Sequence, residues 1–317
     1  MKKFSLVSLV LAAGALLSSC QNQLLTPEKT QPSYVAVEMH SGRVLYSQNA
    51  NVRRPIGMLT NLATAAVVLD WVKSRNISKD RMLRVPASAV QWQRTNLLKL
   101  QPGDTISLRD ALCTAVMVSD SACAATLAHA CGSELNPSSP ESAFVNQMNL
   151  MAKRLGMNST YFKGSNGAVI TQSSARDMAL LGMYVAGYSD GEMLALTSQP
   201  QVTVTVHSAA GARAHTLTNT NRLLSSGVDG LKAATSRTAG SCLLATAHRA
   251  SVKRPNPATG QPGTYAQRLI VVMLGMPSSD SRYSTAAKFI RDGWDAWDAW
   301  LPTNDTKDSS QFIILPN

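Results

Sequence analysis

The sequence contains few residues that bind metals, and none of them has the spacing of a known ligand set. Its 317 residues include five histidines and five cysteines, and neither a C-x-x-C nor an H-E-x-x-H motif occurs. The histidines are isolated from one another: His40, His129, His207, His215 and His248. Because zinc ligands usually come from such short, recurring spacings, we expect neither a metal ion nor any other cofactor.

Long apolar runs are also absent beyond the first twenty residues. A short positive segment precedes an apolar stretch at 4–17, which is short for a membrane span and typical of a signal peptide. The stretch ends in Leu17-Ser18-Ser19-Cys20, which resembles the bacterial lipobox, a cleavage signal whose cysteine is acylated. We therefore expect residues 1–19 to be a lipoprotein signal peptide, Cys20 to carry the lipid anchor, and residues 20–33 to form a polar tether. An ordinary signal peptide with a chance cysteine is the competing interpretation.

Positive charge exceeds negative charge but forms no block. Thirty lysines and arginines stand against nineteen acidic residues, which gives a formal net charge of +11. Because the basic residues are scattered, we expect no nucleic-acid partner. An exported basic protein meets anionic phospholipid, lipopolysaccharide or wall polymer, although a solvated basic surface is the simpler interpretation.

Four cysteines remain if Cys20 is acylated: Cys113, Cys123, Cys131 and Cys242. An even number in an oxidising compartment permits disulfides. Cys123 and Cys131 lie eight residues apart on an expected helix, about 12 Å along its axis, so they cannot pair with each other. We predict that most of the four are small buried hydrophobic residues.

Hydrophobic periodicity and turn residues predict strands, then a block of helices, then strands and one closing helix. The expected strands lie at 34–38, 43–46, 201–207, 242–248 and 268–275. The expected helices lie at 61–73, 107–118, 122–131, 144–155, 173–185 and 284–301. Ser107 is a candidate N-cap, Gly132 and Gly156 are candidate helix ends, and a loop rich in Pro and Gly is expected at 253–264. This order indicates an α+β domain, with an antiparallel sheet built from both chain ends and an inserted helical lobe.

Six segments follow one another in the order typical of one family. Residues 51–65 read NVRRPIGMLTNLATA, which aligns without a gap to N-x-R-R-P-I-A-S-L-T-K-L-M-T-A. The other five are similar to L-G-M-x-x-T-x-F, T-A-R-D, N-T-N-x-L-L, G-V-D-G-L-K and R-L-I-x-V, at 155–162, 174–177, 219–224, 227–232 and 268–272. The set resembles the D-alanyl-D-alanine carboxypeptidase branch of the penicillin-binding proteins. It implies a beta-lactamase/transpeptidase-like fold for residues 34–301, with the helical lobe at about 62–190 and a C-terminal tail at 302–317.

The resemblance also implies a reaction. In that family a serine attacks the carbonyl of the terminal D-Ala-D-Ala peptide bond, and the resulting acyl-enzyme is hydrolysed. The S-x-x-K motif places the serine and a basic lysine on one face of a helix. The S-x-N motif adds a hydroxyl and an amide, and the K-T-G motif adds a cation for the substrate carboxylate.

At the corresponding positions this chain lacks the reactive groups. Met58 takes the place of the nucleophile and Asn61 that of the base, and an amide has no basic nitrogen. The second motif reads Ser119-Asp120-Ser121 when aligned from the upstream helix, and it loses its serine when aligned from the downstream helix. The third reads Lys232-Ala233-Ala234, whose added methyl groups we expect to crowd an extended peptide. Because losing one member of such a unit costs orders of magnitude in rate, we expect no catalytic residue.

We therefore predict a catalytically degenerate member of the family: a cell-envelope lipoprotein that binds peptidoglycan stem peptide or an envelope protein. Lys232 and Arg268 are candidate cations for a peptide carboxylate, although both could equally be ordinary surface or sheet-edge charges. Two rival hypotheses are an active carboxypeptidase with an unrecognised nucleophile and a structural module with no ligand in the former cleft. Because about sixteen residues follow Leu301, too few for a relative's second domain or membrane helix, we expect the lipid to be the anchor. Gln21 weakly favours the outer membrane.

Overall fold

The computed structural model describes residues 31–316, apart from 189–190, 226, 256–259 and 302–307. The predicted signal peptide, Cys20 and most of the predicted tether lie outside the described residues and stay predictions. Within those ranges, no helix combines the length and the apolar character that a bilayer span requires.

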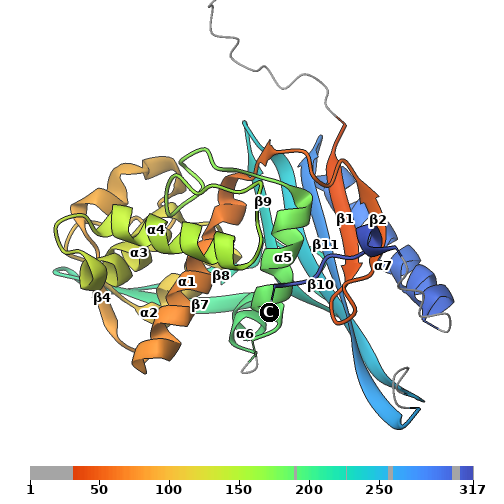
Figure 1. The fold of residues 1–317 in the computed structure, drawn as a ribbon. Helices are drawn as coiled ribbons and strands as arrows, with labels where there is room; N and C mark the ends of the chain where they lie inside the picture. The colour runs from red at the N-terminus through yellow and green to blue at the C-terminus, as the bar shows by residue number, and fades with distance from the viewer. Residues whose placement is uncertain (1–30, 189–190, 226, 256–259, 302–307, 317) are drawn as a thin grey trace, which may run out of the picture. The chain divides into compact units, whose positions relative to one another are not determined.

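A five-stranded antiparallel sheet joins the two ends of the described chain (Figure 1). Its order is β2-β1-β11-β10-β9, with β1 at Ser33–Glu38, β2 at Val44–Gln48, β9 at Val228–Ser236, β10 at Gly240–Pro255 and β11 at Pro262–Met276. In the middle of the sheet, Val272 lies opposite Val35 on one side and Leu244 on the other. The predicted α+β fold, with a sheet built from early and late segments, is therefore confirmed.

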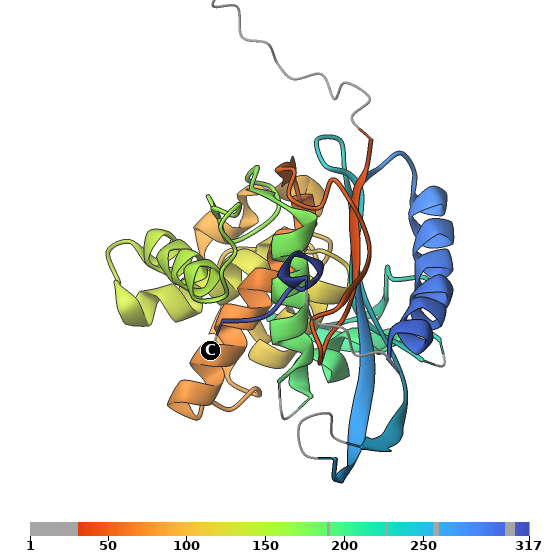
Figure 2. The ribbon, with the colours of Figure 1, turned by 45° about the vertical axis from the view of Figure 1, so that its right-hand side comes forward.

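Alternate side chains of the sheet pack against different helices, because successive strand residues point to opposite faces. Ala36 packs with α7 (Ser279–Trp300), which covers one face (Figure 2). Val35 and Val37 belong to the larger core on the other face, where α5 (Ala175–Ala186) contacts the sheet. The remaining helices form the lobe on that side: α1 (Thr60–Arg75), α2 (Leu108–Met117), α3 (Ser121–Leu135), α4 (Pro140–Arg154) and α6 (Glu192–Thr197).

Two smaller sheets and short 3₁₀ turns complete the described chain. One sheet has the order β4-β5-β7-β8, with strands at Met82–Arg84, Thr105–Ser107, Gln201–Ser208 and Gly211–Thr218, and the other pairs β3 (Arg54–Pro55) with β6 (Gln172–Ser173). The 3₁₀ turns are η1 (Gly57–Leu59), η2 (Ala87–Gln91), η3 (Gln93–Thr95) and η4 (Ser309–Gln311). Strand β8 was not predicted, because only one of its residues is buried and its apolar alternation is weak.

Several predicted helix ends are confirmed. The hydroxyl of Ser107 accepts a hydrogen bond from the backbone N–H of Asp110, so it is the N-cap of α2. Gly156 follows the end of α4 with φ of +72°, a conformation that favours glycine. The four described cysteines are buried and form no disulfide, as expected for small hydrophobic residues.

Three predicted boundaries are wrong. Gly132 does not end α3, because the helix continues to Leu135. A Cβ on Gly132 would lie 2.0 Å from the carbonyl oxygen of Pro140, and this close approach to α4 explains the glycine. Within the expected loop at 253–264, residues 253–255 and 262–264 are strand, because β10 and β11 stay paired as far as Pro255 and Pro262. Helix α7 begins at Ser279, earlier than predicted, behind a capping box formed by Ser278.

Candidate functional site

The first motif lies where η1 leads into α1, beneath the surface of the helical lobe. Met58 is 9 % exposed and Asn61 is fully buried. The spacing of three places both side chains on one face, toward the turn between α2 and α3. The structure thus brings these two positions to the second motif, as the resemblance implies.

Asn61 connects three segments through its side-chain amide. Its Nδ2 donates to the carbonyl oxygen of Ala115 at 3.1 Å and to that of Asp120 at 3.4 Å. Its Oδ1 accepts from the backbone N–H of Gly167 at 3.3 Å. The amide therefore satisfies buried backbone groups, a role that stabilises the fold, and it offers no base.

The thioether of Met58 meets the second motif directly. The hydroxyl of Ser121 lies 3.6 Å from Met58 Sδ and is its hydrogen-bond donor. A Cβ on Gly167 would lie 2.4 Å from Met58 Cα, so the loop at 163–171 packs closely against this residue. Gly167 was not among the predicted site residues. The Asn166-Gly167 dipeptide, which is typical of a turn, is the sequence signal that could have found it.

Asp120, between the two serines, is a buried structural residue. Its carboxylate accepts from the backbone N–H of Cys123 at 2.8 Å, which caps α3, and from that of Leu98 at 3.3 Å. Burial raises the pKa of Asp120, and the backbone hydrogen bonds partly counter that rise. The carboxylate faces these N–H groups, so it holds the loop between η3 and β5 against the start of α3.

Lys232 on β9 is buried among oxygen atoms, with 1 % of its surface exposed. Its Nζ lies 2.7 Å from Ser119 Oγ, 2.7 Å from the carbonyl oxygen of Val116 and 3.3 Å from that of Ala115. Ser119 is half-buried and has φ of +68°. The second and third motifs therefore meet through a Ser119–Lys232 contact.

Burial lowers the pKa of Lys232 to about 7. In the structure Nζ donates to Ser119 Oγ and to both carbonyl oxygens, which an ammonium ion with its three N–H groups satisfies. A neutral amine also fits if it donates two N–H groups to the carbonyl oxygens and accepts the Ser119 hydroxyl proton with its lone pair.

The two alanines of the third motif lie on opposite faces of the sheet. Ala233 packs with Leu243 and Ala245 in the core beneath α7, whereas Ala234 belongs to the core on the side of the helical lobe. Because Ala233 points away from the motif residues, its methyl group cannot crowd a peptide there, and that part of the expectation is wrong.

Arg268 lies apart from the other predicted residues. Lys232 and Val272 both lie beside Leu244, and Arg268 is four residues from Val272, about 13 Å along the strand. The guanidinium lies 2.8 Å from Asp229 Oδ1 and 2.8 Å from Thr246 Oγ1. The second carboxylate oxygen of Asp229 lies 3.0 Å from His248 Nδ1. Both candidate carboxylate-binding cations are therefore already engaged within the chain.

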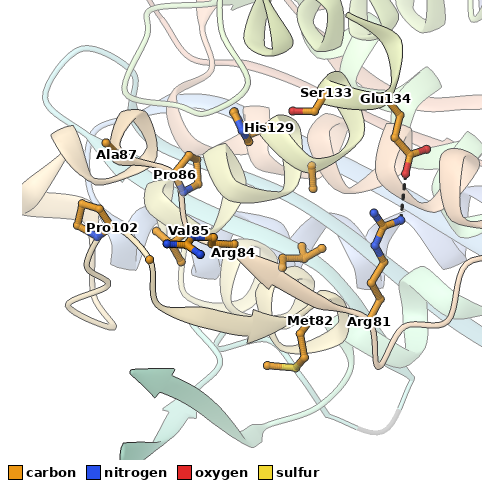
Figure 3. Close-up of a pocket in the computed structure, with 13 residues that line it drawn as sticks. Arg81, Met82, Arg84, Val85, Pro86, Ala87, Pro102, His129, Ser133 and Glu134 are labelled. Carbon is orange, nitrogen blue, oxygen red and sulfur yellow. Dashed lines mark hydrogen bonds and ion pairs between the residues drawn. The ribbon is translucent and has the colours of Figure 1, made fainter. Parts of the chain in front are cut away.

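Among the described residues, three pockets on the helical lobe have walls that contain no residue of the three catalytic motifs. One, of about 580 Å³, lies between β4 and α3 and includes His129, Arg84 and the Arg81–Glu134 ion pair (Figure 3). The other two flank α4 and measure about 680 Å³ and 500 Å³. Among the described residues, no cluster of histidine, cysteine or acidic side chains is suited to a metal ion.

Comparisons with known proteins agree with this arrangement. The peptidase S11 family model, described as D-alanyl-D-alanine carboxypeptidase, matches residues 21–254. The D-alanyl-D-alanine endopeptidase of Escherichia coli is 33% identical over 156 residues, which are 49% of this chain and 47% of that protein. The chain thus spans about half the length of this curated relative. D-alanyl-D-alanine carboxypeptidase DacC of Escherichia coli is 28% identical over 84% of this chain and 62% of its own length.

Solved structures show the same fold. The Streptomyces K15 DD-transpeptidase superposes with a TM-score of 0.71 and 25% identity, covering 83% of this chain and 96% of its own. Penicillin-binding protein D2 of Listeria monocytogenes, in its ampicillin-bound form, gives a TM-score of 0.65 with 28% identity over 83% of this chain and 96% of its own.

Proposed function

The chain belongs to the peptidase S11 family of D-alanyl-D-alanine carboxypeptidases, and we propose that it is a non-catalytic member of that family. In this proposal it acts in the cell envelope by binding a peptidoglycan peptide or a protein partner. The single observation that carries the proposal is the Met58 thioether beside Ser121, at the position where the family keeps its nucleophile. Asn61, hydrogen-bonded to Ala115 and Gly167, supports it from the position of the base.

The chemistry explains why this replacement matters. Acyl transfer needs an oxygen or thiolate nucleophile and a group that takes its proton. A thioether has no proton to lose and forms no acyl intermediate that water can resolve, and the Asn61 amide accepts no proton at neutral pH. Losing both groups removes a rate enhancement of several orders of magnitude.

Release of D-alanine from a peptidoglycan pentapeptide tests the proposal. We expect the full chain to release D-alanine at the rate of a no-protein control, while an active family member run in parallel releases it readily. Turnover above that background that survives repurification would contradict the non-catalytic assignment.

The ligand of the former site is a separate part of the proposal. Lys232 and Arg268 remain proposed carboxylate-binding residues, and their present contacts with Ser119 and Asp229 are internal bonds that a peptide would have to replace. We test Lys232 with Lys232→Met, which keeps the length of the buried side chain, and use Arg237→Ala, an exposed arginine beyond β9, as the control. If Lys232→Met leaves muropeptide binding unchanged, binding through this cation is wrong.

A second candidate function is hydrolysis of the D-Ala-D-Ala peptide bond with Ser119 as the nucleophile and Lys232 as the base. The Ser119–Lys232 contact alone favours it. Ser119 is partly accessible, and it lies 2.7 Å from an amine whose pKa burial lowers to about 7. In a hydrolase of this kind the Ser119 proton passes to neutral Nζ as Oγ bonds to the substrate carbonyl carbon. The ammonium then returns the proton to the leaving amine as the C–N bond breaks, and water cleaves the ester by the same route.

Two variants distinguish this candidate from the first. If Ser119 is a nucleophile, the chain releases D-alanine and Ser119→Ala abolishes that release, while Ser121→Ala retains it. A serine-reactive fluorophosphonate probe would also label Ser119, and the substitution Lys232→Met would prevent this labelling. Absence of both signals in the unsubstituted chain removes this candidate and leaves the non-catalytic one.

A further inference from the structure

A second surface of the helical lobe lies around α4 and is unrelated to the former active site. Two pockets flank this helix, and both include Leu150 in their walls. The first, of about 680 Å³, lies between α4 and α1 and includes Trp71, Leu135 and Met151. The second, of about 500 Å³, lies between α4 and the segment at 157–161. We call the two pockets and the Leu150 ridge between them the α4 groove.

The α4 groove exposes large apolar side chains. Leu150 is 57 % exposed, Tyr161 is 60 % exposed and Leu135 is 45 % exposed. Single exposed leucines are ordinary on a protein surface, but several along one groove mark a site of interaction. On α4, Gln147 and Met151 face the first pocket and Asn149 and Lys153 the second, so Leu150 projects between them.

The charge of the α4 groove is positive. Its basic residues are Lys73, Arg75, Lys153 and Arg154, and Asp70 is the only carboxylate in the walls of the two pockets. Asp70 accepts hydrogen bonds from Tyr184 and Tyr188 and forms an ion pair with Arg154 at 3.0 Å. Its charge is therefore compensated internally, and the other three cations face the groove at exposed positions.

We propose that the α4 groove binds an acidic segment of a partner protein, with two apolar side chains that enter the pockets on either side of Leu150. This inference rests on the proposal that the chain acts by binding, and it assigns the protein partner to a surface other than the former active site. Carboxylates of the partner meet the exposed cations around the pockets, which raises the association rate and selects against basic segments. Two separate pockets suit individual side chains of a peptide, whereas insertion into a bilayer requires a continuous protruding apolar face.

Binding of a designed peptide tests this proposal. The probe is a short fluorescein-labelled peptide with two leucines one helical turn apart, flanked by glutamates, and the comparison peptide has lysine in place of each glutamate. Fluorescence anisotropy with the full chain is expected to show binding of the acidic peptide alone. Charge reversal at two exposed cations, Lys73→Glu with Arg75→Glu, weakens binding at least about tenfold, and Leu150→Ala weakens it severalfold.

Matched variants on other surfaces control for charge and apolar area. Lys253→Glu with Arg291→Glu changes the same amount of charge on exposed residues outside the groove, and Leu97→Ala removes a leucine that is 47 % exposed elsewhere. Neither control should change the affinity.

Four results would overturn the proposal: equal binding of the two peptides, equal effects of groove and control variants, binding of anionic vesicles rather than peptide, or concentration-dependent self-association abolished by Leu150→Ala. None of these bears on D-alanine release, so the groove and the non-catalytic assignment fail separately.

Discussion

The buried lysine of the third motif makes the free energy of unfolding depend on pH in a predictable direction. Burial lowers the pKa of Lys232 from 10.5 in a free side chain to about 7. Below pH 7 the lysine is charged in both states, so the folded state carries the full cost of burying the charge. As the pH rises from 7 toward 10.5, the folded state loses its proton while the unfolded state keeps it, so stability increases.

The size of this increase follows from the same pKa values. The free energy of unfolding rises with pH at a slope that approaches about 1.4 kcal/mol per pH unit once the buried amine is neutral. Between pH 6 and pH 9 the free energy of unfolding should therefore gain roughly 2–3 kcal/mol from Lys232. Lys232→Met removes this contribution, because methionine fills similar space without a titratable group.

Urea denaturation at several pH values measures the effect, followed by circular dichroism. The stability of the full chain minus that of Lys232→Met should rise with pH by the amount given above, and other titrating groups cancel in that difference. A constant difference would mean that Ser119 and the two carbonyl oxygens hold the lysine charged throughout. In that case the neutral amine needed by the second candidate function is absent.

Three further predictions concern the site and the anchor. Gly167→Ala should lower the free energy of unfolding by about 1–3 kcal/mol, because its Cβ would lie 2.4 Å from Met58 Cα; unchanged thermal unfolding would show that the loop does not pack as described. Met58→Ser should leave D-alanine release at background, because Asn61 supplies no base, and measurable release would show that another group takes the proton. Cys20→Ser should abolish incorporation of a labelled fatty acid and move the protein out of the membrane fraction, whereas unchanged fractionation would contradict the lipid anchor.

The fold followed from the sequence where the signals were local. The cap at Ser107 and the glycine at Gly156 mark helix ends by backbone geometry that neighbouring residues determine. Gly132 is a glycine for another reason, since it lies inside α3 where the start of α4 approaches closely. Sequence patterns do not separate these two uses of glycine, because the second depends on tertiary contact.

The candidate site was predicted in its residues but not in its contacts. The ordered motifs gave Met58, Asn61, Ser119, Ser121 and Lys232, and the structure brings them together. The burial of Lys232 among oxygen atoms, the position of Ala233 in the core beneath α7 and the close approach of Gly167 to Met58 depend on how the sheet, its helices and the loop at 163–171 pack together. The contacts of Lys232 with Val116 and of Gly167 with Met58 join segments more than a hundred residues apart, beyond the reach of local pattern.

Covalent labelling by a fluorescent penicillin tests the non-catalytic assignment most directly. Penicillins acylate the nucleophile of active family members, so the stable adduct reports that group without any need for turnover. We predict no boil-resistant fluorescent band on the full chain and no mass increase of the intact protein, under conditions that label an active penicillin-binding protein completely. A stoichiometric adduct on any residue of this chain would contradict the assignment.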